Sequence, residues 1–428
     1  MESFLTYLNE AVTPYHCVLL AKEMLKSAGF QEVSMETPWS FSPVERSVGY
    51  FTAPADGMLF AWVVSPDYRA GDAFRLAIAH TDYPCLHVKP SGEVNGDYSL
   101  LDVEVYGGPI LNTWLDRPLG LAGRVLAADA DGSIRTELVK SERSVVTVPN
   151  LPIHFNRDVN KGVELSRQLD LRPLAGRDME PGWLLARLAE RCHTETEQIL
   201  DYDLYVYNTE QACVTGWNGD MISSPRLDNQ TSCYALLRGI CQALREPQGG
   251  GLSVIGLYDN EEVGSQTRQG ADSALAGMLL EKLYDALGYS SVRLKEAIMR
   301  SRCLSLDVAH ALHPNHPERY DSGNTAKLSD GVVLKLSSTQ KYAYEPLAVA
   351  EAVRLCRERQ IPMRKHVNHS DQPGGSTMGP LMASWLPMPT LDMGVPIMAM
   401  HSSRELMSWA DEKALLAFAE AFLGGLQA

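Results

Sequence analysis

Acidic side chains and histidines follow four stretches of the chain that the apolar pattern predicts to be buried strands. These strand ends read Ala79-His80-Thr81-Asp82, Asp259-Asn260-Glu261-Glu262, Leu306-Asp307 and Met400-His401, and a fifth segment, which contains Asp228, begins a predicted helix. In open α/β sheets, ligands bind beyond the carboxyl ends of the strands. Each residue alone could be a polar loop residue, but five segments at one edge predict a shared site.

Two histidines and several carboxylates, with no thiolate, are the ligand types that suit a pair of divalent metal ions. Together with one hydroxide, the carboxylates of Asp228, Glu262 and Asp307 would balance the charge of two Zn²⁺ ions. Without metal these acids would repel one another, and some would take up protons. We therefore predict a site that is complete only with metal. Zn²⁺ is the expected ion, and Co²⁺ or Mn²⁺ would accept the same ligands.

The adjacent pair Glu261-Glu262 predicts a division of roles. Neighbouring carboxylates at a strand end can point apart, so that one binds metal while the other handles a proton. Asp82 follows His80 by two residues and lies on the same side of an extended segment. We therefore expect Asp82 to orient the imidazole of His80 from behind.

Strands that alternate with helices must position these residues. Strands are predicted at residues 74–80, 252–257, 303–306, 332–336 and 396–400. Helices are predicted at residues 14–29, 229–244, 273–287, 347–359 and 403–423, with Gly249-Gly250-Gly251 as a turn. This alternation predicts an α/β fold with a mixed central sheet and helices on both faces.

The middle of the chain has a different sequence pattern. Short β-rich runs between Gly and Pro turns occupy the stretch from residue 89 to about residue 200, where a single long helix is predicted at residues 181–200. We therefore expect a discontinuous catalytic α/β domain, residues 1–88 and 214–428, interrupted by a mainly β inserted domain, residues 89–213.

Composition limits the classes of partner. The 428 residues carry 38 Lys and Arg against 53 Asp and Glu, which gives a formal net charge of −15. This balance disfavours binding to nucleic acid or to an anionic membrane. No apolar run approaches the length of a membrane span, and the first ten residues lack the pattern of a signal peptide. Eight scattered cysteines without a Cys-x-x-Cys pair indicate reduced thiols. We expect a cytoplasmic protein.

Several longer motifs identify a relationship. They are Ala79-His80-Thr81-Asp82-Tyr83-Pro84, Asp102-Val103-Glu104-Val105-Tyr106-Gly107-Gly108, Val148-Pro149-Asn150-Leu151-Pro152-Ile153-His154, Asp259-Asn260-Glu261-Glu262-Val263-Gly264-Ser265, Asp307-Val308-Ala309-His310-Ala311-Leu312-His313, Gly374-Gly375-Ser376-Thr377-Met378-Gly379 and Met400-His401-Ser402-Ser403-Arg404-Glu405. With these motifs the sequence resembles the M18 aminopeptidases, which include aspartyl aminopeptidase, over nearly its whole length.

This resemblance implies the fold and the reaction of a two-metal exopeptidase, which removes N-terminal residues from peptides, with a preference for Asp or Glu there. It implies one metal on His80 and Asp307, a second on Glu262 and His401, and Asp228 bridging the two. Glu261 would be the general base, and Asp82 would support the ligands. Contacts to substrate are implied for His154, His310, Lys335 and Tyr342, with His154 reaching a neighbouring subunit. Members of the family assemble through the insertion into dimers and larger particles, often dodecamers.

Other interpretations compete with these expectations. The same two-metal site would suit a deacylase or carboxypeptidase, and a relative that had lost turnover would be a binding protein. Lys335 could form a structural salt bridge instead of contacting a substrate carboxylate, and His154 could be an auxiliary metal ligand or structural. The histidines at 87, 366 and 369 are expected to be ordinary polar residues, and Pro314 and Pro317 argue against a helical metal cluster of His310, His313 and His316.

Overall fold

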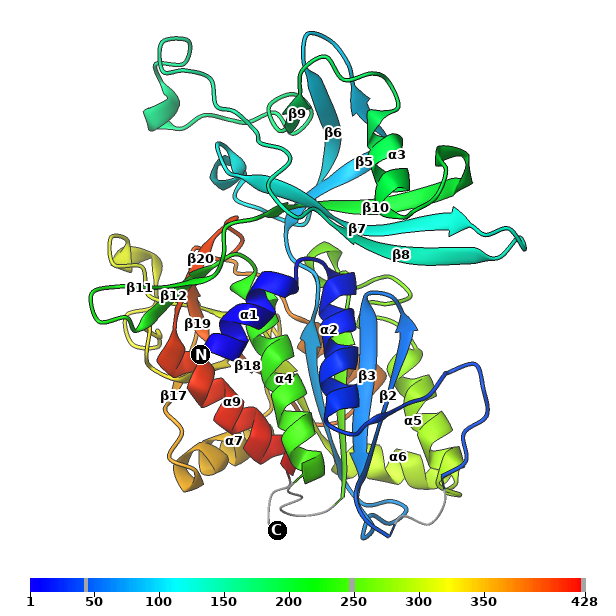
Figure 1. Ribbon diagram of the computed structural model, residues 1–428. Helices are drawn as coiled ribbons and strands as arrows, with labels where there is room; N and C mark the ends of the chain where they lie inside the picture. The colour runs from blue at the N-terminus through cyan, green and yellow to red at the C-terminus, as the bar shows by residue number, and fades with distance from the viewer. Residues whose placement is uncertain (42–44, 246–250, 425–428) are drawn as a thin grey trace.

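The largest element of the fold is a nine-stranded mixed sheet. The computed structural model describes residues 1–41, 45–245 and 251–424, and Figure 1 shows this sheet in the lower part of the molecule. In spatial order its strands are β1 (Gln31–Glu32), β2 (Val48–Ala55), β3 (Met58–Val64), β13 (Leu252–Tyr258), β4 (Phe74–His80), β14 (Arg302–Leu306), β18 (Thr390–Gly394), β16 (Val332–Lys335) and β17 (Met363–His366).

The central strands of this sheet share one direction. β4 is parallel to both β13 and β14, and β14 is parallel to β18. β3 runs antiparallel to β2 and β13, whereas β16 runs antiparallel to β18 and parallel to β17. Tyr258 pairs with His80 at the last rung of β13 and β4. Because parallel strands end at the same edge of a sheet, the segments that follow β13, β4 and β14 emerge together there.

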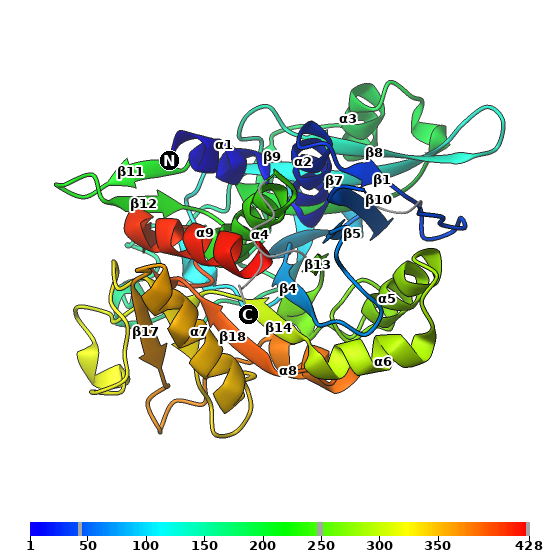
Figure 2. The same cartoon turned by 90° about the horizontal axis from the view of Figure 1, so that it is seen from below.

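Helices cover both faces of the sheet, as Figure 2 shows. One face carries α1 (Glu2–Glu10), α2 (Pro14–Ser27), α4 (Leu227–Arg245), α7 (Pro346–Glu358) and α9 (Trp409–Gly424), and the other carries α5 (Leu275–Ala286), α6 (Ser291–Arg300) and α8 (Met378–Trp385). Side chains alternate along β13, so that Ile255 and Leu257 pack in the first core and Leu252 and Val254 in the second. Burial on both faces explains why β13 is apolar apart from Ser253 and the hydroxyl of Tyr258. The predicted α/β class is confirmed.

A six-stranded antiparallel sheet stands above this body in Figure 1, with α3 (Trp183–Arg191) against it. Its strands, in spatial order, are β8 (Ile134–Lys140), β7 (Leu119–Ala128), β10 (Ile199–Asn208), β5 (Cys85–Val94), β6 (Ser99–Tyr106) and β9 (Leu174–Gly176). It has an apolar core of its own, which includes Trp114, Leu119 and Leu204. The sheet is built from the middle of the chain, where the sequence changes to short β-rich runs between Gly and Pro turns.

A third sheet of five short strands completes the fold beside the carboxyl edge of the large sheet. Its strands are β11 (Cys213–Thr215), β12 (Met221–Ser224), β20 (Glu405–Ser408), β19 (Pro396–Met398) and β15 (Ala309–His310). Short 3₁₀ helices span Leu111–Trp114, Val159–Lys161, Thr196–Gln198, Glu261–Val263 and Pro317–Arg319. This small sheet carries His401 in the connection between β19 and β20.

Two predicted helices are wrong in extent. The helix expected at residues 181–200 ends at Arg191, because residues 199–208 pair with β7 as strand β10. The helix expected from Ser403 begins only at Trp409, because residues 405–408 pair with β12 and β19 as β20. In both cases tertiary pairing overrides a local helical pattern. Gly249 and Gly250, predicted to form a turn, lie outside the described residues.

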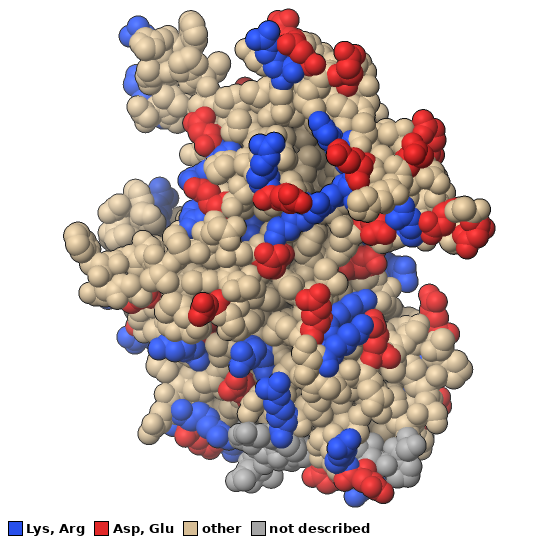
Figure 3. All heavy atoms as spheres, viewed as in Figure 1, with Lys and Arg blue, Asp and Glu red and all other residues tan. Residues whose placement is uncertain are grey.

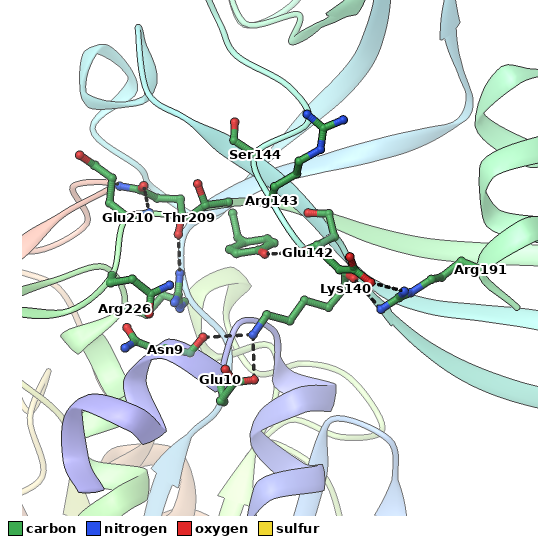
Figure 4. Close-up of a pocket in the computed structure, with 14 residues that line it drawn as sticks. Asn9, Glu10, Lys140, Glu142, Arg143, Ser144, Arg191, Thr209, Glu210 and Arg226 are labelled. Atoms are coloured by element: carbon green, nitrogen blue, oxygen red, sulfur yellow. Dashed lines mark hydrogen bonds and ion pairs between the residues drawn. The ribbon is translucent and has the colours of Figure 1, made fainter. Parts of the chain in front are cut away.

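The surface of the molecule has no large field of one charge on the face shown in Figure 3, where acidic and basic side chains are interspersed. Within the described residues, no helix has the length and apolar character needed to cross a bilayer. A hollow of about 520 Å³ lies between the end of α1 and the six-stranded sheet (Figure 4). Ion pairs of Lys140 with Glu10 and of Arg191 with Glu142 line this hollow, and none of the predicted metal ligands does.

Candidate metal centre

Five segments meet in a second hollow, of about 510 Å³, at the carboxyl edge of the large sheet. His80 is the last residue of β4, Asp307 follows β14, and the 3₁₀ turn Glu261–Val263 follows β13. Asp228 lies at the start of α4, and His401 comes from the small sheet. Residues of these segments that line the hollow include His80, Asp228, Glu261, Glu262, Asp307 and His401. The structure thus brings together the residues that the sequence predicts as metal ligands.

Candidate ligand atoms form three groups within the described residues, and two of these groups share the carboxylate of Asp228. In the first group, Nε2 of His80 lies 3.3 Å from Oδ1 of Asp228 and 3.6 Å from Oδ1 of Asp307. In the second, Nε2 of His401 lies 3.4 Å from Oδ2 of Asp228 and 3.4 Å from Oε2 of Glu262. The two oxygens of Asp228 therefore face two different histidines. In each group the three atoms lie within 4.8 Å of one another, which is the reach of a single ion.

The Nδ1 atom of each imidazole contacts a backbone oxygen, which fixes the orientation of the ring. Nδ1 of His80 lies 3.1 Å from the backbone oxygen of Asp82 and 3.3 Å from its Oδ1. Nδ1 of His401 lies 3.1 Å from the backbone oxygen of Gly108. With a proton on each Nδ1, Nε2 of both rings presents a lone pair to the hollow.

Asp82 also fixes the turn that carries the two glutamates. Its Oδ1 accepts a hydrogen bond from the backbone N–H of Glu261, and its Oδ2 accepts one from the N–H of Glu262, each at 3.1 Å. The hydroxyl of Tyr106 donates to Oδ2 as well, at 2.7 Å. The carboxylate of Asp82 is completely buried and serves as a shared acceptor for these groups and for His80.

When no metal ion is present, protons on the two histidines and the ammonium of Lys335 balance part of the carboxylate charge in the site. Burial alone would lower the pKa of His80, but the carboxylates of Asp228, Asp307 and Asp82 raise it well above its usual range. Burial likewise opposes protonation of His401, whose pKa Asp228 and Glu262 raise to about 10. Burial and the charge of Asp228 raise the pKa of Glu262 well above its usual value. Divalent cations would replace these protons.

The residues present fit a pair of metal ions. The donor set is nitrogen and carboxylate oxygen without thiolate, which suits Zn²⁺ among the divalent ions. Oδ1 of Asp228 is buried and has no hydrogen-bond partner within the described part of the chain. An orphaned buried carboxylate oxygen between two further ligands costs free energy, and a cation would remove that cost.

Three of the four predicted substrate contacts lie at the same hollow. His310, Lys335 and Tyr342 line it, but the Lys335 ammonium is already engaged. It donates to Oδ2 of Asp307 at 3.2 Å and to the backbone oxygen of Val308 at 3.0 Å. The fourth, His154, is exposed on a loop of the middle segment and does not line this hollow.

Two residues of the site were not singled out by the sequence. Glu405 is buried, and its carboxylate accepts hydrogen bonds from the backbone N–H of Asp228 at 3.1 Å and of His401 at 2.9 Å. Its only sequence signal is its place in the motif after His401. His366, expected to be an ordinary polar histidine, is buried and lines the hollow. Its position follows from the pairing of β17 with β16, which the local sequence does not specify.

A mixed α/β sheet whose carboxyl edge carries two groups of candidate metal ligands sharing one aspartate is the arrangement expected of a two-metal hydrolase. A family profile described as "Aminopeptidase I zinc metalloprotease (M18)" matches residues 7–423. The chain therefore belongs to the M18 family of zinc aminopeptidases, and it is a metal-dependent hydrolase that removes N-terminal residues from peptides. The deacylase, carboxypeptidase and nonenzymatic interpretations are not supported.

Individual relatives agree with this placement. The chain is 36% identical over 409 residues to "Probable M18 family aminopeptidase 2" of Clostridium novyi, covering 94% of this chain and 93% of the relative. It is 33% identical over 434 residues to "Aspartyl aminopeptidase" of Caenorhabditis elegans, covering 94% and 90%.

Solved structures share the fold. A chain from "Cryo-EM structure of the Ape4 and Nbr1 complex" superimposes with a TM-score of 0.93 at 30% identity, covering 99% of this chain and 85% of that one. An M18 aminopeptidase from Thermotoga maritima superimposes with a TM-score of 0.85 at 22% identity, covering 99% and 95%. The second similarity concerns the fold alone.

Proposed function

We propose that this aminopeptidase works with two divalent cations at the residues described above. His80 and Asp307 would hold one cation, Glu262 and His401 the other, and Asp228 both. The observation that carries this assignment is the geometry of Asp228, whose two oxygens face two different histidines at 3.3 and 3.4 Å.

Zn²⁺ bound at these residues supplies Lewis acidity to the scissile carbonyl of the peptide. Glu261 lies beside the ligands, with its backbone held by Asp82, and we assign it the transfer of protons. Its carboxylate takes a proton from the attacking water and returns it to the departing amine. Burial raises the pKa of Glu261 to about 8 in the absence of cations. Bound cations would lower this pKa toward neutral pH, because they favour the charged carboxylate.

Metal stoichiometry tests the assignment of ligands. The wild-type chain is expected to bind two Zn²⁺ ions, and His401→Gln and His80→Gln are each expected to retain one tightly bound ion. Asp228→Asn is expected to weaken both. Two ions bound to Asp228→Asn with wild-type affinity would contradict the shared position of Asp228.

We further propose a preference for Asp or Glu at the substrate N-terminus. One of the relatives carries the name aspartyl aminopeptidase, and the cation of Lys335 lines the hollow over the ring of Tyr342. Since the net charge of −15 would not steer acidic substrates inward, the preference must come from such local contacts. Aminoacyl substrates that differ only in the first residue test this proposal, and equal kcat/KM for Asp and Leu would refute it.

The inserted segment, residues 89–213, is proposed as a cap and as the site of assembly into a homo-oligomer. One structural neighbour is described as a dodecamer. The loop around His154 exposes Leu151 and Phe155, with Phe155 81% exposed, as expected for a surface that a second subunit covers. Light scattering after chromatography measures the assembly. A monomer at micromolar concentration would contradict it, as would unchanged assembly of the double variant Leu151→Ser, Phe155→Ser.

A cytoplasmic location completes the proposal. All eight cysteines are free thiols in the structure, and seven of them are buried, which fits a reducing compartment. Cell fractionation tests this location.

A further inference from the structure

A chain of hydrogen bonds runs behind one wall of the metal hollow. His366, at the end of β17, lies opposite Lys335 in the register of β16 and β17. Nε2 of His366 lies 3.1 Å from Oδ1 of Asn368, and Nδ2 of Asn368 donates to the hydroxyl oxygen of Tyr342, also at 3.1 Å. His366 and Tyr342 line the hollow, whereas Asn368 joins them from outside it.

The direction of these hydrogen bonds fixes what Tyr342 can do. Because Oδ1 of Asn368 can only accept, Nε2 of His366 must carry the proton. Because Asn368 donates to the Tyr342 oxygen, the hydrogen of that hydroxyl is left for another acceptor. Within the described residues, no acceptor for it lies within hydrogen-bonding distance, although the Tyr342 side chain is 4% exposed.

The unpartnered Nδ1 of His366 favours this direction over the reverse one. If the amide of Asn368 were turned end for end, Tyr342 would donate to Asn368, and His366 would carry its proton on the unpartnered Nδ1. Lys335 lies near both rings, with its ammonium 4.7 Å from the centre of the Tyr342 ring, and its charge acts on His366. An N–H on the buried Nδ1 would be a donor without an acceptor within the described residues. Burial and this cation also lower the pKa of His366, so the ring is neutral at pH 7.

We propose that His366 and Asn368 are positioning residues that hold the Tyr342 hydroxyl as a hydrogen-bond donor for a carboxylate on the first side chain of the substrate. This inference rests on the proposed preference for acidic N-terminal residues. It gives that preference a second donor beside Lys335, which donates two of its three N–H groups to Asp307 and Val308.

The test compares Asp and Asn as the first residue of otherwise identical aminoacyl substrates, since the two side chains have the same shape and only Asp presents two acceptors. Asn368→Asp keeps the shape of residue 368 but replaces its donor by an acceptor, so that the Tyr342 hydroxyl turns its hydrogen away from the substrate. We expect the ratio of kcat/KM for Asp over Asn to fall at least about 10-fold. Asn368→Leu, which leaves the hydroxyl free to rotate, should lower the ratio about 3- to 10-fold.

Two controls separate this role from a general effect of charge or folding. Asn315→Asp introduces the same charge at an exposed position after His313 and should change the ratio less than 2-fold. In a Tyr342→Phe background, Asn368→Leu should have no further effect on the ratio. His366→Leu should lower the ratio as Asn368→Leu does, and it serves as the second variant if Asn368→Asp does not fold.

Two results would overturn the proposal. One is an effect of Asn368→Asp no larger than that of Asn315→Asp, and the other is a full effect of Asn368→Leu that persists without the Tyr342 hydroxyl. The wild-type ratio of Asp to Leu substrates tests the acidic preference separately. A failure of that preference would therefore be distinguished from a failure of the hydrogen-bond chain.

Discussion

Replacing Asp82 by Asn should weaken the hold of the site on its metal without unfolding the chain. The Asp82 carboxylate accepts from four donors: the backbone N–H groups of Glu261 and Glu262, the Tyr106 hydroxyl and Nδ1 of His80. An asparagine offers one oxygen and one N–H₂ group in the same space. The new amide nitrogen costs less free energy at the position of Oδ2 than at that of Oδ1, because the Tyr106 hydroxyl can rotate and accept a hydrogen bond from it.

The backbone N–H of Glu262 cannot reverse in this way and is left facing another donor. An unpaired buried donor costs about 1–3 kcal/mol, which corresponds to a loss of about 5- to 150-fold in an equilibrium constant. Because Glu262 is a proposed ligand, we expect this cost to appear in metal affinity. The expected range agrees with the 10- to 100-fold that groups behind metal ligands typically contribute.

Competition with a chromophoric chelator measures this affinity, and circular dichroism checks the fold. At saturating Zn²⁺ the variant should recover most of its kcat, because none of the proposed ligands has been removed. Asp97→Asn, an exposed position, serves as the control. A metal affinity of folded Asp82→Asn within 2-fold of wild type would refute the reasoning.

Three further predictions follow from the same structure. Glu261→Gln should lower kcat at least about 100-fold with both ions still bound, and unchanged turnover would remove Glu261 from its role. Gly394→Ala should weaken metal binding, because its Cβ would lie 1.9 Å from the backbone oxygen of Asp307, whereas Gly277→Ala in α5 meets no atom within 4 Å and should leave metal binding unchanged. His16→Asn should reduce the loss of stability in acid: burial first, and then Lys140, lower the pKa of His16 from 6.5 to about 4. The stability that neutral His16 contributes is therefore present above pH 6.5 and lost as the pH falls toward 4, a difference of about 2–3 kcal/mol that urea unfolding at pH 7 and pH 4.5 would detect.

The large sheet and the ligand segments were accessible from the sequence for a physical reason. Strands buried on both faces read as continuous apolar runs, and a polar residue directly after such a run, such as His80 or Asp307, must lie at the sheet edge. The structure brings these residues together, and their individual roles remain predictions.

Features that depend on distant pairing were not accessible. Residues 199 and 200 were predicted as the end of a helix, but they begin strand β10, whose pairing with β7 is distant in the sequence. Residues 405–408 likewise form β20, which places the Glu405 carboxylate behind Asp228 and His401. His366 reaches the hollow only because β17 pairs with β16. No local pattern encodes any of these contacts.

Activity of metal-free protein, reloaded with known equivalents of Zn²⁺, tests the central claim most directly. Peptides with a free N-terminus and the same peptides acetylated would be assayed at each step. We expect no activity after exhaustive chelation, full recovery only after the second equivalent, and cleavage of the free peptides alone. Activity that survives complete removal of metal, or full recovery with the first equivalent, would contradict a site built from two cations around Asp228.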